Sequence, residues 1–291
     1  GNITAGTDYE VPLTKEQKLS IEQAYNIIMD EFKTHVRTVG LDYSDRGAPI
    51  LSSTKEDSHA GYSVDRKVRR TPWREDFPDN ISMTNNKALN RYKDLLAKGK
   101  AGDREAAEDL VLKFVKSDKI KALEKNYPDA IIVPVIAEEK AGRNVIPLIY
   151  ANMISELTGL EVTGEIYQAN RAYRTQKGAI ERMFTPVQFD GPVDAGKDYI
   201  LLDDVFTLGG TMAGLKAHIE SKGGNVAQTT TLSTARGNRI VINANELKAV
   251  EVQHGSIENF EKLLQDEGII NEAIRELTAP ELRCFLRFRN A

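Results

Sequence analysis

The chain has 291 residues, 41% of them hydrophobic and 28% charged, and a formal net charge of −4. These values are typical of a folded globular protein and argue against wholesale binding of nucleic acid. The chain contains no apolar run of about 18 residues and opens with no secretory signal, so a cytoplasmic protein without a membrane partner is expected. The single cysteine, Cys284, excludes an internal disulfide and a Cys-rich metal site.

Residues 1–125 are expected to form a mainly helical appendage. Thr14 and Gln17 have the spacing of a capping box, and apolar residues at helical spacing follow until about Gly40. Residues 41–85 lack periodicity and are interpreted as an irregular segment. Two further helices are expected between residues 86 and 125, the second with Asp103 as its N-cap.

The densest basic run of the chain lies inside the irregular segment. Its cationic residues are Arg66, Lys67, Arg69, Arg70 and Arg74. One interpretation is a solvated loop that Trp73 attaches to the fold. The other is a contact for an anionic substrate or nucleic acid, with Trp73 stacked on a base.

An α/β core is expected over residues 126–245. Residues 130–136 form a near-continuous apolar run, as in strands buried on both faces of a parallel sheet. A polar loop at 137–144 and an apolar-striped helix from about Ile146 follow. Residues 165–182 then carry a cation every three to five positions without an apolar stripe behind them: Arg171, Arg174, Lys177 and Arg182.

Residues 199–216 combine a strand, a polar loop and a helix. Residues 199–202 are apolar and predict a buried strand, with Asp203 and Asp204 at its end. A Gly/Thr loop then opens a helix that is expected to stop at Gly223. Free N–H groups at a helix start and flexible glycines suit a phosphate. The two carboxylates suit vicinal sugar hydroxyls or Mg²⁺, so the pattern predicts a site for a phosphorylated ribose.

This stretch, Ile200 to Thr211, resembles the phosphoribosyl pyrophosphate (PRPP) motif of type I phosphoribosyltransferases. The resemblance covers about residues 128–240. It implies that Asp203 and Asp204 contact the ribose and Mg²⁺ and take part in catalysis. The residues implied to bind the 5′-phosphate are Thr207, Leu208, Gly209, Gly210 and Thr211. Leu208 stands where many members have a second threonine and orotate-type members have alanine.

Two more segments are assigned through the same resemblance. The loop at 137–144 is similar to the family's pyrophosphate loop, which implies that the departing diphosphate is bound by Lys140, Gly142, Arg143 and Asn144. The cation-rich segment stands where the family has a mobile loop that closes over the site, which implies catalytic roles for Arg174 and Lys177. The amino-acid sequence of this cation-rich segment also resembles that of the competence-associated ComF-like branch of the family. For both segments an ordinary surface loop is the alternative.

After the central helix, a strand is expected at 226–233, a turn at 234–238 and a short strand at 239–242. Residues 246–291 are expected to be a helical extension. Ser256 caps one of its helices, which ends at Gly268. Another is expected from about 269 to 277, and Thr278 with Glu281 forms a capping box for the last.

The fold class expected is α/β, a parallel-sheet type I phosphoribosyltransferase-like core with helical N- and C-terminal additions. The implied activity is transfer of 5-phosphoribose from Mg²⁺-bound PRPP to a nitrogen nucleophile, with release of pyrophosphate. Thr207 argues against a 6-oxopurine acceptor, because purine-salvage members carry a basic aspartate at that position. The alternatives are a PRPP- or nucleotide-sensing regulator that binds nucleic acid without turnover, and a hydrolase or transferase acting on another ribose phosphate. The acceptor and the oligomeric state, for which a homodimer is one option, stay open.

Overall fold

The computed structural model describes residues 42–43, 49–50, 69–139, 142–169 and 187–286. The chain divides into two units, residues 55–284 and residues 1–54 with 285–291. In the second unit β1 (Asp42–Tyr43) pairs with β2 (Pro49–Ile50) in antiparallel fashion. The helix expected over residues 14–40 lies outside the described residues. All that follows concerns the first unit.

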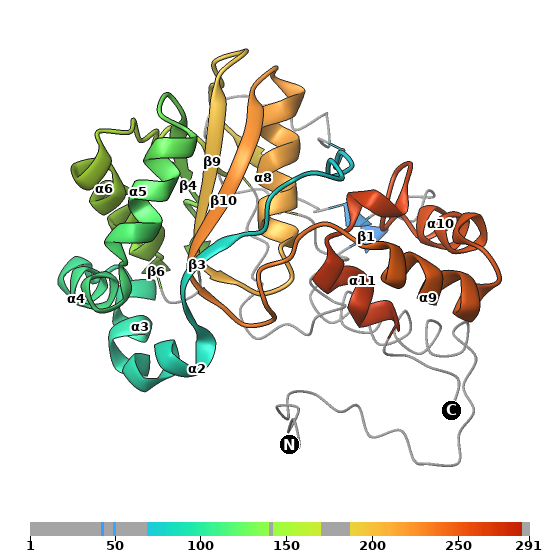
Figure 1. Cartoon of the computed structure of the whole chain (residues 1–291), viewed down its shortest axis with the longest axis horizontal. Coiled ribbons are helices and arrows are strands. Elements are labelled where there is room, and N and C mark those ends of the chain that lie inside the picture. Colours follow the sequence, from blue (N-terminus) through green and yellow to red (C-terminus); the bar gives the residue numbers. More distant parts are fainter. Residues whose placement is uncertain (1–41, 44–48, 51–68, 140–141, 170–186, 287–291) are drawn as a thin grey trace. The chain divides into compact units, whose positions relative to one another are not determined.

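A four-stranded parallel sheet forms the centre of this unit, in the order β3-β10-β9-β4 (Figure 1). Its strands are β3 (Ile81–Asn85), β4 (Ile131–Pro134), β9 (Asp198–Phe206) and β10 (Asn225–Thr234). The expected α/β class and three of these strands are confirmed. Strand β3 lies where an irregular segment was predicted, so that prediction was wrong for residues 81–85. Five residues without a clear alternation give little local signal, and the pairing with β10 orders them.

The chain reverses its direction across the sheet between β4 and β9. On its outer side β4 meets residues 161–163: the Ile132 N–H donates to the Glu161 carbonyl at 2.8 Å, and the Thr163 N–H to the Ile132 carbonyl at 3.0 Å. Helix α6 (Ile146–Thr158) leads outward to this segment, whereas α8 (Gly210–Ser221) leads from β9 inward to β10. The two connections pack on opposite faces, as right-handed crossovers require.

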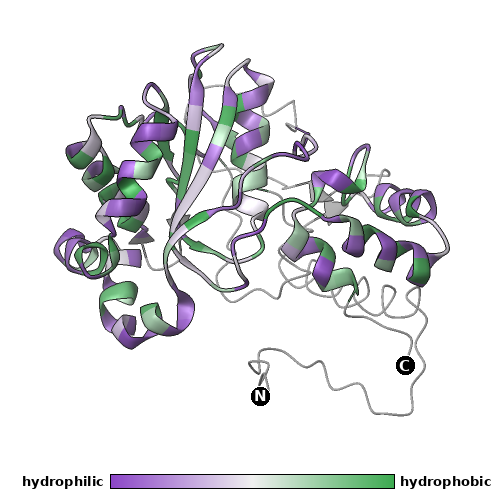
Figure 2. Ribbon diagram, in the orientation of Figure 1, coloured by the Kyte–Doolittle hydropathy of each residue, from purple (hydrophilic) through white to green (hydrophobic). Residues whose placement is uncertain are grey.

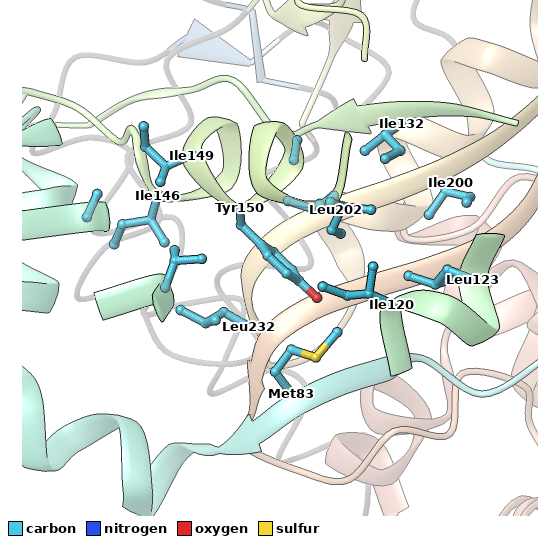
Figure 3. Close-up of a cluster of buried hydrophobic side chains, with 14 of the residues drawn as sticks. Met83, Ile120, Leu123, Ile132, Ile146, Ile149, Tyr150, Ile200, Leu202 and Leu232 are labelled. Atoms are coloured by element: carbon cyan, nitrogen blue, oxygen red, sulfur yellow. The ribbon is translucent and has the colours of Figure 1, made fainter. Parts of the chain in front are cut away.

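One face of the sheet is covered by helices from two parts of the chain. They are α2 (Asn86–Leu89), the one-turn η1 (Asn90–Tyr92), α3 (Lys93–Lys100), α4 (Arg104–Phe114), α5 (Ser117–Asn126) and α6. Asp103 caps α4 as predicted, with its carboxylate accepting the Ala106 N–H at 3.0 Å. Figure 3 shows Ile120, Leu123, Ile146 and Tyr150 from these helices packed around Ile200 and Leu202 of β9. The packing is therefore continuous across residue 125, where a boundary was expected.

The other face is covered by α8, by Trp73 and Phe77, and by the antiparallel pair β7 (Tyr167–Gln168) and β8 (Phe189–Asp190). Segment 71–73 is attached to α8 through Lys216, whose side chain is 2% exposed. Its ammonium lies 2.7 Å from a Glu220 carboxylate oxygen and 2.6 Å from the Thr71 hydroxyl. It also lies 5.1 Å from the centroid of the Trp73 ring.

Strand β10 is unusually polar for a buried strand, and its colours in Figure 2 are mostly pale. The hydroxyls of Thr229 and Thr231 bond to the side chain of Asn80 at 3.0 and 2.9 Å. The Thr230 hydroxyl donates to the Ile81 carbonyl at 2.8 Å and lies 2.9 Å from the Tyr150 hydroxyl. These bonds satisfy the hydroxyls of the three consecutive threonines and connect β10 to β3 and α6.

The C-terminal part contains α9 (Ala244–His254), α10 (Ile257–Asp266), the one-turn η2 (Ile274–Glu276) and α11 (Ala279–Leu286). The predicted caps are confirmed: Ser256 accepts the Asn259 N–H at 3.1 Å, and Thr278 and Glu281 form the capping box. The helix expected at 269–277 is replaced by an irregular turn. The buried Glu276 carboxylate accepts the N–H groups of residues 271, 272 and 273, which holds the backbone there out of a helix.

The short strand expected at 239–242 is also absent from this part of the structure. The Ile240 carbonyl instead accepts the Ala279 N–H at 2.6 Å, and Arg239 pairs with Glu246 at 2.6 Å. The Ile240 carbonyl, which a strand ladder would need, is thus bonded to the start of α11, and the Arg239 side chain is bonded to α9. Among the helices the structure describes, none combines the length and the apolar character needed to cross a bilayer.

Candidate functional site

The two aspartates were predicted at the end of the strand, but β9 continues past them to Phe206, so they lie inside it. The ladder with β4 stops earlier, at the pair Pro134 and Leu202. On that side β9 therefore continues alone through Asp203 and Asp204. This is the carboxyl edge of the sheet at the point where the chain reverses direction, and open α/β sheets bind their ligands there.

Asp204 is buried and held by three partners. Its Oδ2 lies 2.9 Å from the Lys100 ammonium and accepts the Asn144 side-chain amide at 3.1 Å, and the Val205 N–H also bonds to the carboxylate. Burial alone would raise the pKa of Asp204. The Lys100 charge and these hydrogen bonds outweigh it and lower the pKa. Asp204 is thus the charged member of the pair.

Asp203 is partly exposed and accepts the N–H of Asp204 at 2.8 Å. Desolvation raises the pKa of Asp203 well above its usual value of 3.8, and the neighbouring Asp204 carboxylate raises it further. Two adjacent carboxyls whose surroundings shift their pKa values apart offer a proton donor beside an acceptor. Such a pair can bond to sugar hydroxyls in either direction.

Lys100 is a site residue that the sequence did not reveal. It ends α3, 104 positions before its partner Asp204, and no local pattern distinguishes it from its neighbours Lys98 and Lys93. Its position depends on Gly99. A Cβ at Gly99 would lie 2.8 Å from Ile146 Cγ1, so only glycine allows α3 to approach α6 this closely.

The predicted phosphate loop has the geometry of an anion site. Gly209 has φ of +82°, a left-handed conformation that favours glycine, and α8 begins at Gly210. The first N–H groups of a helix have no partner within the helix, and its dipole favours an anion there. Leu208 is buried, so its side chain faces the protein and only its backbone is available to a ligand.

Residues of the C-terminal part, together with Arg70, support the phosphate loop through hydrogen bonds and an ion pair. The Thr278 hydroxyl donates to the Leu208 carbonyl. Arg70 donates to the Gly210 carbonyl at 3.5 Å and makes a two-pronged ion pair with Glu281, at 2.9 and 3.1 Å. Both Arg70 and Glu281 are largely buried, so the pair is a structural support for the loop.

The basic run around Arg70 is therefore divided between different roles. Trp73 is 3% exposed and packs edge-on against Phe77, which favours its interpretation as an anchor and leaves no face for a base. Arg69 and Arg74 are exposed, and Arg74 lies 3.6 Å from Asp76. Arg66 and Lys67 lie outside the described residues.

The predicted diphosphate loop forms a small antiparallel hairpin of β5 (Glu138–Glu139) and β6 (Gly142–Arg143). Arg143 is exposed, whereas Asn144 turns inward, donates to Asp204 and accepts the Ile146 N–H at 3.2 Å. Asn144 therefore joins the acid pair. Lys140 lies outside the described residues, as do the cations of the other predicted loop: Arg171, Arg174, Lys177 and Arg182.

The acid pair does not fit a metal ion held by both aspartates. The Asp204 Oδ2 already accepts an ammonium and an amide group, and Asp203 accepts a backbone N–H. Within the described part of the chain, no three His, Cys, Asp or Glu side chains are grouped so as to hold a metal. A divalent cation here would depend on oxygens that a ligand brings with it.

Comparison with known proteins gives two curated relatives, and no protein-family model matches the chain. Protein TraN of Escherichia coli is 33% identical over 192 residues, which are 65% of this chain and 42% of TraN. An uncharacterized protein of Haemophilus influenzae is 34% identical over 176 residues, which are 59% of this chain and 39% of that protein. The chain thus spans about two-fifths of the length of these relatives.

Similar solved structures include an adenine phosphoribosyltransferase, with a TM-score of 0.31 and 17% identity over 43% of this chain and 70% of that one. Leishmania donovani UMP synthase gives a TM-score of 0.28 and 16% identity over 62% of this chain and 33% of that one. These scores are too low for the likeness to support any inference about chemistry.

Proposed function

We propose that this chain is a phosphoribosyltransferase, which binds PRPP at the carboxyl edge of β9 and transfers its 5-phosphoribosyl group to a nitrogen nucleophile. One observation carries the proposal. Two adjacent aspartates whose pKa values are shifted in opposite directions lie near the end of β9, and a glycine-opened helix start follows that strand, at the point where the chain reverses across a parallel sheet. The finer assignment to the type I fold rests on the motif from Ile200 to Thr211.

In this proposal the two ends of PRPP are bound by different chemistry. The N–H groups at the start of α8, with Thr207 and Thr211, take the 5′-phosphate. Asp203 binds a ribose hydroxyl. The backbone N–H of Asp204, whose own carboxylate is fixed by Lys100 and Asn144, orients the Asp203 carboxylate. The substrate is the Mg²⁺ complex of PRPP, so the metal arrives on phosphate oxygens.

The reaction breaks the bond between C1 of the ribose and the diphosphate oxygen and forms a bond from C1 to nitrogen, with pyrophosphate as the leaving group. The described residues would contribute by positioning the ribose and by stabilising charge. Thr207 offers no base near neutral pH, so the proton of the nucleophile goes to another acceptor. Charge neutralisation on pyrophosphate by Lys140, Arg174 and Lys177 belongs to the same proposal.

The second candidate is a regulator that binds PRPP or a nucleotide without turnover and contacts nucleic acid through its basic run. The burial of Trp73 and the pairing of Arg70 remove two of the groups that such a contact would use. Arg69 and Arg74 are the exposed cations left in the described part of that run. A hydrolase or transferase acting on another ribose phosphate would use the same acid pair and loop.

Calorimetric titration with PRPP and Mg²⁺ tests the binding step. The variant in which Asp203 and Asp204 are both replaced by asparagine should lose binding, and Asp129→Asn, at an exposed acid on another loop, should retain it. Unchanged binding by the double variant would refute the site. Pyrophosphate release in the presence of nucleobases and amines then separates the enzyme from the regulator.

A further inference from the structure

The acid pair already contains a cation that belongs to the chain. The Lys100 ammonium lies 2.9 Å from Asp204 Oδ2, and the Asn144 amide reaches the same oxygen at 3.1 Å. A Mg²⁺ ion bound directly to this oxygen would have to lie about 2.1 Å from it, within the space these two donors occupy. The two positive charges would also repel each other strongly at such a separation.

Lys100 is not a surface side chain that meets Asp204 by chance. The Gly99 carbonyl accepts the N–H groups of Val145 and Gly102, each at 3.2 Å, which fixes the end of α3 against the start of α6. The missing Cβ of Gly99 permits this contact. The second partner, Asn144, is fixed in turn by the Ile146 N–H. Both donors to Asp204 are thus positioned by backbone bonds on the same side of the sheet.

We propose that Lys100 is the resident counter-ion of the acid pair, a positioning residue that orients Asp204 and keeps divalent cations off its carboxylate. The pair then binds hydroxyl groups through Asp203, and any metal enters on the phosphate oxygens of the substrate. The hydroxyl-bearing ligand rests on the proposed function, whereas the exclusion of metal by Lys100 does not. The pair differs in this way from a two-carboxylate metal site.

The exclusion of divalent cations from the Asp204 carboxylate can be measured without any substrate. The protein is titrated with Mn²⁺, and the free ion is followed by electron paramagnetic resonance. Lys100→Met keeps much of the aliphatic stem and removes the charge, so it should bind one Mn²⁺ about tenfold or more tightly than the wild type. Lys100→Arg keeps the charge and should match the wild type. Adding Asp204→Asn to Lys100→Met should abolish the gain.

Two results would overturn the proposal. One is a folded Lys100→Met protein with no gain in Mn²⁺ affinity. The other is a wild-type protein whose Mn²⁺ binding falls in Asp204→Asn, because the metal would then share Asp204 with Lys100. The second comparison needs no Lys100 variant, so it decides the matter even if Lys100→Met fails to fold.

Titration of the same variants with PRPP and Mg²⁺ separates this proposal from the proposed function. If the wild type binds no PRPP but Lys100→Met gains the Mn²⁺ site, the counter-ion role stands and the phosphoribosyl ligand is wrong. If PRPP binds and the Mn²⁺ gain is absent, the site stands and the role of Lys100 is refuted.

Discussion

Replacing Thr278 with valine should make the conformation of the phosphate loop less stable, while every residue proposed to contact the ligand stays unchanged. Thr278 is fully buried at the start of α11. Its hydroxyl donates to the Leu208 carbonyl and accepts the Glu281 N–H at 3.3 Å. Valine has nearly the same shape, so the change removes these two bonds and little packing.

The expected magnitude follows from the two bonds. A buried carbonyl that loses its donor costs about 1–3 kcal/mol of stability. Loss of an N-cap hydroxyl costs about 1 kcal/mol. We therefore expect the free energy of unfolding to fall by about 2–4 kcal/mol. Leu208 directly precedes Gly209, so a freed carbonyl adds about one residue to be ordered when a phosphate binds. That ordering costs about 1–2 kcal/mol, or roughly tenfold in affinity.

Urea unfolding and calorimetric titration with PRPP and Mg²⁺ measure the two effects. Thr230→Val is the matched control, because Thr230 is also buried and also makes two bonds, to the Ile81 carbonyl and the Tyr150 hydroxyl. It should lose similar stability and keep the wild-type affinity for PRPP. Hydrogen exchange of the amides of residues 207–211 should quicken in Thr278→Val alone, with no ligand present.

The reasoning is refuted if Thr278→Val and Thr230→Val lose the same stability and bind PRPP equally well. In that case Thr278 supports the fold in general, and the conformation of the loop does not depend on it.

Three further predictions concern the same strand and loop. The folded protein holds the Asp203 proton more tightly than the unfolded chain does, so this group contributes stability below about pH 4 that is lost as the pH rises through its raised pKa. Asp203→Asn should therefore gain stability relative to the wild type toward neutral pH in urea unfolding, and an equal difference at every pH would contradict this. Gly209→Ala should cost more stability than Gly196→Ala: both glycines have φ near +80°, but only at Gly209 would the Cβ meet a side chain, Thr278 Cγ2 at 2.9 Å. Because Thr207 cannot serve as a base, hypoxanthine or guanine with PRPP and Mg²⁺ should yield no nucleotide on chromatography, and efficient formation of either would show the exclusion to be mistaken.

Local patterns in the sequence predicted many of the features that depend on neighbouring residues, although not the turn at 271–276, where the Glu276 carboxylate replaces the expected helix. Apolar runs predicted β4 and β9, because strands buried on both faces need continuous hydrophobic residues. Strand β10 was also predicted, although most of its residues are polar. The helix caps at Asp103 and Ser256 were predicted because a cap bonds to N–H groups only two or three residues away. The acid pair and the phosphate loop were visible because they lie on one continuous stretch of chain.

Only the tertiary structure showed which distant residues contact the stretch that carries the acid pair and the phosphate loop, or support it. Lys100 reaches Asp204, Thr278 reaches Leu208 and Arg70 reaches Glu281 across 70 to 211 positions of sequence. Strand β3 likewise gains its order by pairing with β10. Such contacts depend on close packing between distant segments, as where Gly99 admits Ile146, and no periodicity or spacing along the chain encodes them. The sequence by itself therefore determined the binding stretch, and the packing around it decided which side chains hold it and in which state of charge.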